Sequence, residues 1–174
     1  MTDVTLRPAR LDDAEATRQI YNVEVIESTI TFDLVPRSLE EQRRWLSARS
    51  GVHAVIVAED RSTGDVVGFA SLSPWRDRPA YATSVEDSVY VHRDHRGRGI
   101  GRLLLADLVA VATAHGFHAM FARIVEGHEP SIALHRSLGF EIAGVEREVG
   151  RKFGRWLDVV VMELLLSGQP AGRS

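Results

Sequence analysis

A short basic segment near the middle of the chain carries glycine at every second position. It reads Arg96-Gly97-Arg98-Gly99-Ile100-Gly101-Arg102. The β-branched and aromatic run Ser88 to Val91 precedes it and an apolar periodic stretch follows, so a strand, a glycine turn and a helix are predicted. Glycine has no side chain, so its backbone can come close to a ligand. The first amides of a helix have no hydrogen-bond partner within the helix and can donate to an anion. Arginine side chains bind phosphate oxygens well. The segment therefore predicts a diphosphate site; a tight turn with solvated arginines is the alternative.

Common nucleotide-binding motifs do not fit this segment. A dinucleotide fingerprint, G-x-G-x-x-G, needs glycine where Arg102 stands, and a P-loop needs Gly-Lys followed by Ser or Thr, which the sequence lacks. The pattern that fits is Arg/Gln-x-x-Gly-x-Gly after a strand. It resembles the pyrophosphate loop of the GNAT acetyltransferases. The resemblance implies acetyl-coenzyme A (acetyl-CoA) as the cosubstrate, bound by residues 96–102.

Composition narrows the class of protein. The 174 residues carry a formal charge of -3 and include no cysteine. This charge gives no electrostatic reason to expect nucleic acid or an anionic membrane as partner, and disulfides, thiolate metal sites and a cysteine nucleophile are excluded. No signal peptide is indicated, and no apolar run is long enough to span a bilayer. We expect one cytoplasmic domain over residues 1–166 and a disordered tail over residues 167–174.

Periodicity and turn residues predict alternating strands and helices. Strands are expected at Val4 to Pro8, Ala54 to Glu59, Val66 to Leu72, Thr83 to Val91, Ala119 to Val125, Phe140 to Val149 and Trp156 to Leu166. Helices are expected from Asp12 or Asp13 to Ser28, from Ser38 toward Gly51, from Gly101 to His115 and from Ser131 to Leu138. The order β-α-α-β-β-β-α-β-α-β-β predicts an α/β fold, and it is also the order of the GNAT acyltransferase fold, a mixed central β-sheet flanked by helices.

Several segments are similar to one branch of that family, the phosphinothricin and methionine sulfoximine/sulfone N-acetyltransferases. They are Tyr21-Asn22, Trp75-Arg76, Val85-Glu86, Ser88 to Val91, His135, Leu138 to Phe140 and Val149 to Asp158. The stretch Phe153 to Asp158 is the most specific match. The resemblance covers Leu6 to Leu166 and implies a small amino-acid analogue as acceptor and a homodimeric assembly.

Acetyl transfer to an amine needs a base, a group that stabilises the oxyanion and a proton for the departing thiolate. Glu86 lies on the strand that enters the glycine turn, and the resemblance implies that it accepts the amine proton. A solvent-facing carboxylate paired with Arg76 is the alternative. The backbone of Val89 and Val91, with Tyr90 between them, is the expected contact for the thioester, because an extended arm can add to an unpaired strand edge.

The resemblance also assigns roles around the short helix. His135 is the candidate acid, with a structural histidine as the alternative, and a positioned water could also supply the proton. His128 stands where the family usually has an asparagine that binds the pantetheine arm, and imidazole does not reproduce an amide's donor and acceptor. Ser131 and Ser137 are further implied cofactor contacts. The histidine pairs in the sequence lack additional ligands, so no metal site is predicted.

The expected acceptor site draws on the loop between Ser73 and Ala82. Arg76 and Arg78 can bind a carboxylate in a bidentate manner. The other candidate substrate contacts are Phe32, Trp75, Tyr81, Val85 and Glu86. The arginines argue against a polyamine or an aminoglycoside, which would favour an acidic groove. Two rival functions stay open: acetylation of a peptide N-terminus or another amine, and a non-catalytic acyl-CoA sensor.

Overall fold

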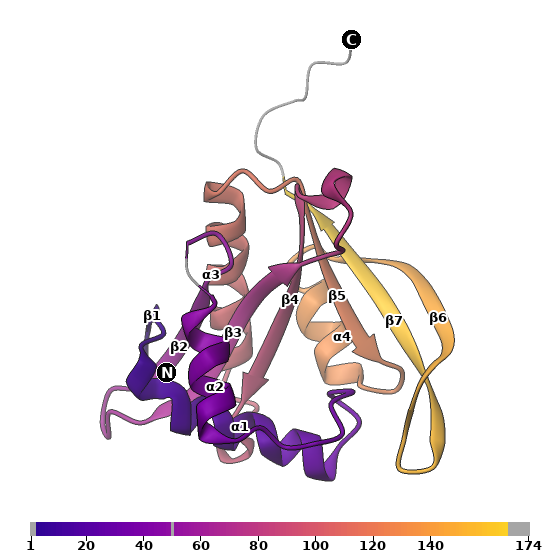
Figure 1. Ribbon diagram of the computed structural model, residues 1–174. Coiled ribbons are helices and arrows are strands. Elements are labelled where there is room, and N and C mark those ends of the chain that lie inside the picture. The colour runs from indigo at the N-terminus through magenta and orange to yellow at the C-terminus, as the bar shows by residue number, and fades with distance from the viewer. Residues whose placement is uncertain (1–2, 50, 167–174) are drawn as a thin grey trace.

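One seven-stranded sheet forms the centre of the molecule, in the order β1-β2-β3-β4-β5-β7-β6. The computed structural model describes residues 3–49 and 51–166, so the tail expected over residues 167–174 lies outside the described part. The strands are β1 (Val4–Pro8), β2 (Val55–Asp60), β3 (Val66–Pro74), β4 (Ser84–Val91), β5 (Ala119–Val125), β6 (Glu141–Lys152) and β7 (Arg155–Leu165). Neighbours pair antiparallel except β4 and β5, which are parallel. The predicted element order and mixed sheet are confirmed (Figure 1).

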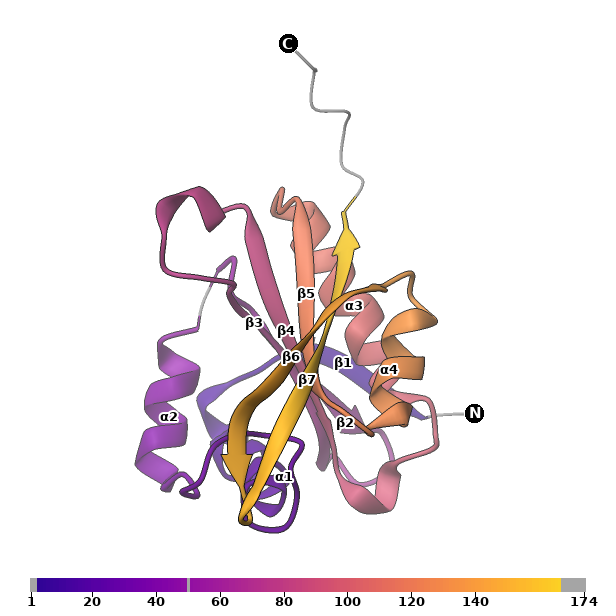
Figure 2. The same ribbon diagram turned by 90° about the vertical axis from the view of Figure 1, so that its right-hand side faces the viewer.

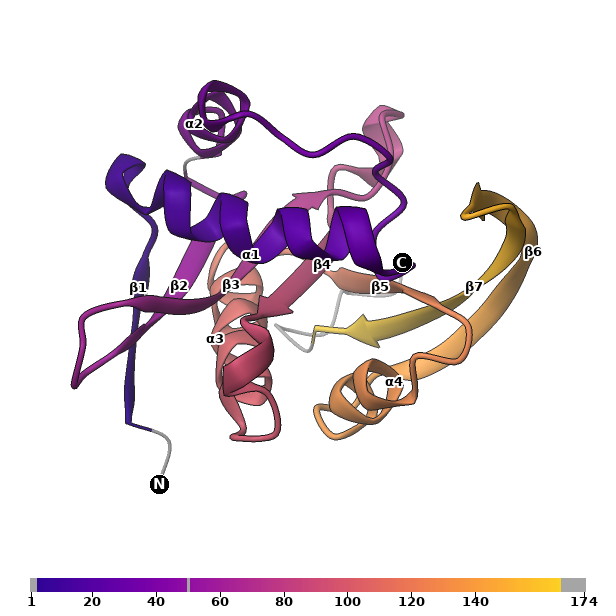
Figure 3. The same cartoon turned by 90° about the horizontal axis from the view of Figure 1, so that it is seen from below.

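Helices cover both faces of the sheet (Figure 3). They are α1 (Ala14–Glu27) and α2 (Leu39–Ser47) on one face, and α3 (Ile100–Ala114) and α4 (Glu129–Arg136) on the other. Each face has its own apolar core: Phe69 and Tyr90 pack toward α1 and α2, whereas Val85 and Val89 pack toward α3 and α4. Because successive strand residues point to opposite faces, β4 contributes alternately to both cores.

Local signals in the sequence account for the helix ends. The Ser38 hydroxyl accepts a hydrogen bond from the Glu41 amide, and the Glu41 carboxylate accepts one from the Ser38 amide, so the predicted capping box opens α2. Gly116 follows α3 with a φ of 79°, a conformation that favours glycine. Short 3-10 turns cover Leu11–Asp13, Pro79–Tyr81 and Arg93–His95.

Several element boundaries differ from the prediction. Helix α4 begins at Glu129 instead of Ser131, because Pro130 is tolerated in a first helical turn, where a backbone N–H has no partner to lose. The last two strands extend to a tight turn at Phe153 and Gly154, whose φ values are 50° and 74°. Two successive residues with positive φ match the right-handed twist of a hairpin, so β6 and β7 pair up to the turn.

Strands β4 and β5 pair only at their first residues. The register joins Ser84 to Ala119, Val85 to Met120 and Glu86 to Phe121, and no further pairs follow among the described residues. Figure 1 shows the two strands diverging below this point, with α4 behind the opening, and Figure 2 shows the β6–β7 hairpin in front. Within residues 3–49 and 51–166, no helix has the length and apolar character needed to cross a membrane.

Candidate active site

The open edge of β4 faces the gap between β4 and β5. The Ser84 carbonyl accepts from the Trp75 amide on the β3 side, whereas the Thr83 carbonyl accepts from the His118 amide on the β5 side. Backbone groups alternate in direction along a strand, so the N–H and C=O groups of odd-numbered residues face β5. Beyond Glu86 the strands have separated, and the backbone groups of Val89 and Val91 therefore face the gap.

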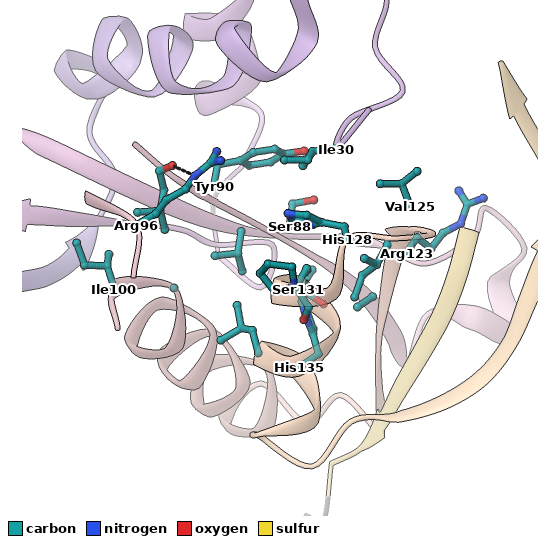
Figure 4. Close-up of a pocket in the computed structure, with 18 of the residues that line it drawn as sticks. Ile30, Ser88, Tyr90, Arg96, Ile100, Arg123, Val125, His128, Ser131 and His135 are labelled. Carbon is teal, nitrogen blue, oxygen red and sulfur yellow. Dashed lines mark hydrogen bonds and ion pairs between the residues drawn. The ribbon is translucent and has the colours of Figure 1, made fainter. Parts of the chain in front are cut away.

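A cavity of about 500 Å³ occupies this gap. Residues of β4, β5, the glycine turn and α4 line it, and Figure 4 shows Arg96 and Arg123 at its opposite ends. Its size and its mixture of apolar walls with a few polar groups are typical of a site for an extended small molecule.

The glycine turn forms one end of the cavity. Gly97 and Gly99 have φ values of 73° and 82°, and Gly99 is the N-cap of α3. Arg96 donates from Nε to the Val91 carbonyl at 3.2 Å and from Nη2 to the buried Glu24 carboxylate at 2.7 Å, which fixes its side chain beside the turn. The left-handed turn leaves backbone amides next to free helix amides and a cation, and this donor set fits a diphosphate.

Gly101 lies where α3 faces α4. A Cβ atom at this position would lie 3.4 Å from Cδ2 of Leu134, which is an ordinary contact distance, so alanine would fit here beside α4. The other two arginines of the segment lie differently: Arg98 lines a neighbouring cavity with Asp60 and His95, and Arg102 lies on the first turn of α3 outside the described cavity linings.

Glu86 lies where β4 and β5 separate. Its register partner is Phe121, whose ring stacks on Trp75 at a centroid distance of 4.2 Å. Burial raises the pKa of Glu86 to about 7, although the positive charge of Arg123 opposes the shift. A carboxylate that titrates near neutrality can both accept and release a proton under ordinary conditions.

Asp87 and His135 form a buried pair on the opposite face of β4. Nε2 of His135 lies 3.0 Å from Oδ2 of Asp87, and Nδ1 lies 2.7 Å from the Ser131 carbonyl. Burial alone would lower the pKa of His135, but the bonds to the carboxylate and the carbonyl favour the charged ring, and the pKa lies above its ordinary value. Each ring nitrogen faces an acceptor, so a doubly protonated imidazole satisfies both.

The remaining residues predicted around α4 divide into two groups. His128, which precedes α4, and Ser131 both line the cavity. Burial and the nearby Arg96 charge lower the pKa of His128, so the neutral ring predominates at neutral pH. Ser137 lies at the end of α4, where its hydroxyl donates to the Leu134 carbonyl, outside the described cavity linings.

A smaller slot of about 140 Å³ adjoins the main cavity at the Glu86 end. The two spaces share four residues and the slot adds two apolar side chains. The shared residues are Ile30, Glu86, Arg123 and Val125, and the additional ones are Phe32 and Val159. A slot whose lining combines apolar side chains with a carboxylate and a guanidinium can hold a small amphipathic acceptor.

The structure corrects one predicted acceptor contact and separates several others from the slot. The Val85 side chain is fully buried in the core toward α3, because alternation directs residues 85 and 86 to opposite faces.

The predicted contacts in the Trp75 to Tyr81 loop lie beside one another. Cζ of Arg76 lies 5.0 Å from the ring centroid of Trp75 and 6.0 Å from that of Tyr81. Trp75, Arg76, Arg78 and Tyr81 lie outside the described cavity linings, although Trp75 stacks beside Glu86 through Phe121.

The cavity-lining residues that were not predicted include Ile30, Asp87 and Arg123. Arg123 is the one charged residue of the otherwise apolar segment Ala119–Val125, and Asp87 is a second acid in the strand of Glu86. Charged residues inside apolar strands are a usable signal of a functional face. In the part of the chain that the structure describes, no group of three or more His, Cys, Asp or Glu residues is placed to hold a metal ion.

Comparison with known proteins gives consistent matches along most of the chain. Residues 6–161 match the family described as acetyltransferase (GNAT) domain. The chain is 43% identical to a phosphinothricin N-acetyltransferase of Streptomyces coelicolor, over 92% of this chain and 95% of that protein. It is 42% identical to an L-methionine sulfoximine/L-methionine sulfone acetyltransferase of Pseudomonas paraeruginosa, over 93% and 94%.

A solved structure agrees with these matches. The chain resembles a GNAT superfamily phosphinothricin acetyltransferase from Sinorhizobium meliloti, solved in complex with acetyl-CoA, with a TM-score of 0.91. The two are 40% identical, and the match covers 99% of this chain and 95% of that one.

Proposed function

The chain belongs to the GNAT acetyltransferase family, and from this membership we propose that it transfers the acetyl group of acetyl-CoA directly to the α-amine of a small amino-acid analogue. We rank methionine sulfoximine and methionine sulfone first and phosphinothricin next, following the Val149 to Asp158 stretch. Relatives with both activities in their names match the chain about equally well. The observation that carries the proposal is the position of Glu86, which lines both the main cavity and the adjoining slot.

Acetyl-CoA supplies a thioester carbonyl carbon when it is bound in the gap. Glu86 accepts the proton that the amine releases as its nitrogen bonds to that carbon. The amides of Val89 and Val91 both face the gap, but they lie two residues apart on one strand. One of them stabilises the negative charge on the carbonyl oxygen, and the other binds the extended arm of the cosubstrate. The carbon–sulfur bond then breaks, and the thiolate receives a proton.

His135 is our proposed source of this second proton. Its Nδ1 atom lies 3.5 Å from the Ser131 hydroxyl, which lines the cavity. The hydroxyl passes a proton to the thiolate and takes one from the imidazolium. Because Glu86 and Asp87 point to opposite faces of β4, the base lies on the α1 side of the thioester and the acid on the α4 side. This separation keeps the two proton transfers apart.

The loop from Trp75 to Tyr81 is proposed to close on the outer end of the acceptor. Arg76 and Arg78 carry donors that suit an anionic or tetrahedral polar group, and the aromatic rings beside Arg76 hold its guanidinium in place. Binding at both ends would orient the amine toward the thioester. Arg76→Ala is therefore expected to raise the Michaelis constant of the acceptor.

We also propose that the protein is a homodimer that associates through the β6–β7 hairpin. Several large apolar side chains of this hairpin are exposed: Ile142, Val145, Val149, Phe153 and Trp156. The hairpin lies at the edge of the sheet, and a second copy of the chain would cover both the edge and the apolar side chains. The cytoplasmic location expected from the sequence stays a prediction.

Release of free thiol from acetyl-CoA tests the function. Methionine sulfone, methionine sulfoximine, phosphinothricin and a peptide with a free N-terminus are compared in parallel, with an acceptor-free control. We expect thiol release with the first three compounds. Release with the peptide alone would show that the acceptor class is wrong, and acetyl-CoA binding without thiol release in any mixture would favour the sensor.

A further inference from the structure

A guanidinium lies at the acceptor end of the site. Arg123 lines both the main cavity and the slot, and Figure 4 places it at the end opposite to Arg96. We propose that Arg123 binds the carboxylate of the amino-acid acceptor and that Glu146 takes the place of this carboxylate when no acceptor is bound. The inference rests on the proposed function and names the residue that selects acceptors with a free carboxylate.

The covalent structure of an α-amino acid requires the two binding groups to be neighbours, because one carbon separates the amine from the carboxylate. Glu86 pairs in register with Phe121, and alternation places Arg123 on the same face of β5 as Phe121. Glu86 and Arg123 therefore lie on one side of the sheet, and both line the same slot. A carboxylate held by Arg123 brings the amine to Glu86 and directs the side chain into the slot.

Arg123 pairs with Glu146, and the geometry and exposure of this pair make it easy to displace. Nε and Nη2 of Arg123 both donate to the same oxygen of Glu146, and the Nε distance is 3.1 Å. The two side chains are 35% and 31% exposed, so solvent weakens the pair. A guanidinium prefers to bind both oxygens of a carboxylate through two parallel bonds. An acceptor carboxylate that enters the slot can offer this geometry and displace Glu146.

The other cations around the site have different positions. Arg96 lies at the glycine turn and pairs with Glu24. Arg76 lies over the Trp75 ring, outside the slot.

The nearby lysine is already bonded within the protein. Lys152 is buried and its ammonium group donates to the Thr31 carbonyl at 2.7 Å. Among the residues described here, Arg123 is the cation that lines the slot together with Glu86.

The test compares methionine sulfone with its carboxamide, which keeps the amine and the sulfone but lacks the carboxylate. Kinetics are measured at pH 9, above the Glu86 pKa of about 7, because loss of the Arg123 charge would raise that pKa. The wild-type enzyme is expected to prefer the acid. In Arg123→Ala and Arg123→Gln, we expect the KM of the acid to rise about 10- to 100-fold, the effect of a lost charge-assisted bond, while the KM of the carboxamide and both kcat values change little. Glu146→Gln should lower the KM of the acid.

Two control variants and the carboxamide make the result decisive. Arg43→Ala removes an exposed arginine of α2 and should behave as wild type, whereas Arg76→Ala should raise KM for acid and carboxamide alike. Equal effects of the Arg123 variants on both acceptors, or a wild-type enzyme without preference for the acid, would overturn the inference while the proposed function stands. A wild-type enzyme that acetylates neither compound would instead overturn the proposed function and this inference together.

Discussion

The ring of Phe32 lies directly against the backbone of Gly150. Phe32 belongs to the loop after α1 and Gly150 to β6, and a Cβ atom on Gly150 would overlap the ring. The neighbouring bond from Lys152 to the Thr31 carbonyl joins the same two segments. Since Phe32 also lines the acceptor slot, the β6–β7 hairpin supports one wall of that slot.

Gly150→Ala should therefore impair acceptor binding. The methyl group displaces the Phe32 ring, so the acceptor loses part of its apolar contact with this wall. The loss of about 1 kcal/mol of binding free energy should raise the KM of the acceptor about fivefold. Acetyl-CoA affinity, measured by calorimetry, should not change. The control is Gly144→Ala on the same strand, where an added Cβ meets nothing within 4 Å. Equal KM values for the two variants would show that Phe32 does not shape the slot.

Glu86→Gln should lower kcat by about two to four orders of magnitude, the usual share of general base catalysis. The base must be unprotonated, so wild-type kcat/KM should rise with pH through about 7, the pKa of Glu86. The variant should lose this rise and still bind acetyl-CoA. Glu126→Gln removes an exposed carboxylate just beyond β5 and should retain wild-type rates. If kcat/KM of Glu86→Gln still rises near pH 7, the rise belongs to the titration of another group.

Gly99→Ala should weaken acetyl-CoA binding by about tenfold or more, because the added Cβ atom keeps the diphosphate from coming close to the backbone amides of the turn. Its φ of 82° adds strain of about 1 kcal/mol. Gly116→Ala imposes similar strain at the other end of α3, where φ is 79° and no atom lies within 4 Å of an added Cβ. Both substitutions should lower the melting temperature in thermal unfolding. Calorimetry should show weaker acetyl-CoA binding only for Gly99→Ala. Unchanged affinity in a folded Gly99→Ala would refute the diphosphate assignment.

Asp87→Asn should lower the pKa of His135, which nuclear magnetic resonance titration can follow. The folded-state pKa of His135 is raised, so its contribution to stability is complete below its ordinary value of 6.5 and is lost as pH rises through the raised value. The difference in unfolding free energy between wild type and Asp87→Asn should thus be larger at pH 5.5 than at pH 9. In a His135→Gln background this pH dependence should disappear. A difference that stays constant with pH would argue against a charged His135.

Trp156→Glu should convert a dimer into a monomer. The Trp156 side chain is 61% exposed on the hairpin, and a buried charge at an apolar interface is strongly unfavourable. Light scattering at micromolar concentration should give twice the chain mass for wild type and the chain mass for the variant. Leu11→Glu makes the same change at an exposed leucine in the turn before α1 and should remain dimeric. A monomeric wild-type protein would exclude the proposed assembly.

Features that depend on neighbouring residues can be predicted from the sequence. The glycine turn, the capping box of Ser38 and Glu41, and the strand that carries Glu86 follow from φ preferences, caps and alternation, which act over a few residues. The sequence predicts the start of α4 at Ser131 and the helix begins at Glu129, because Pro130 is compatible with both a loop and a first helical turn. The same alternation rule that points Glu86 into the site could have excluded Val85 as an acceptor contact.

Contacts between residues far apart in the sequence become visible in the folded chain. The bond between Asp87 and His135 depends on how α4 packs against β4, and the pair of Arg123 and Glu146 depends on the pairing of β5, β7 and β6. The contact of Phe32 with Gly150 joins a loop to a hairpin from the other end of the chain. These contacts follow from packing and strand register between segments far apart in sequence, and periodicity within one segment carries no information about its partner.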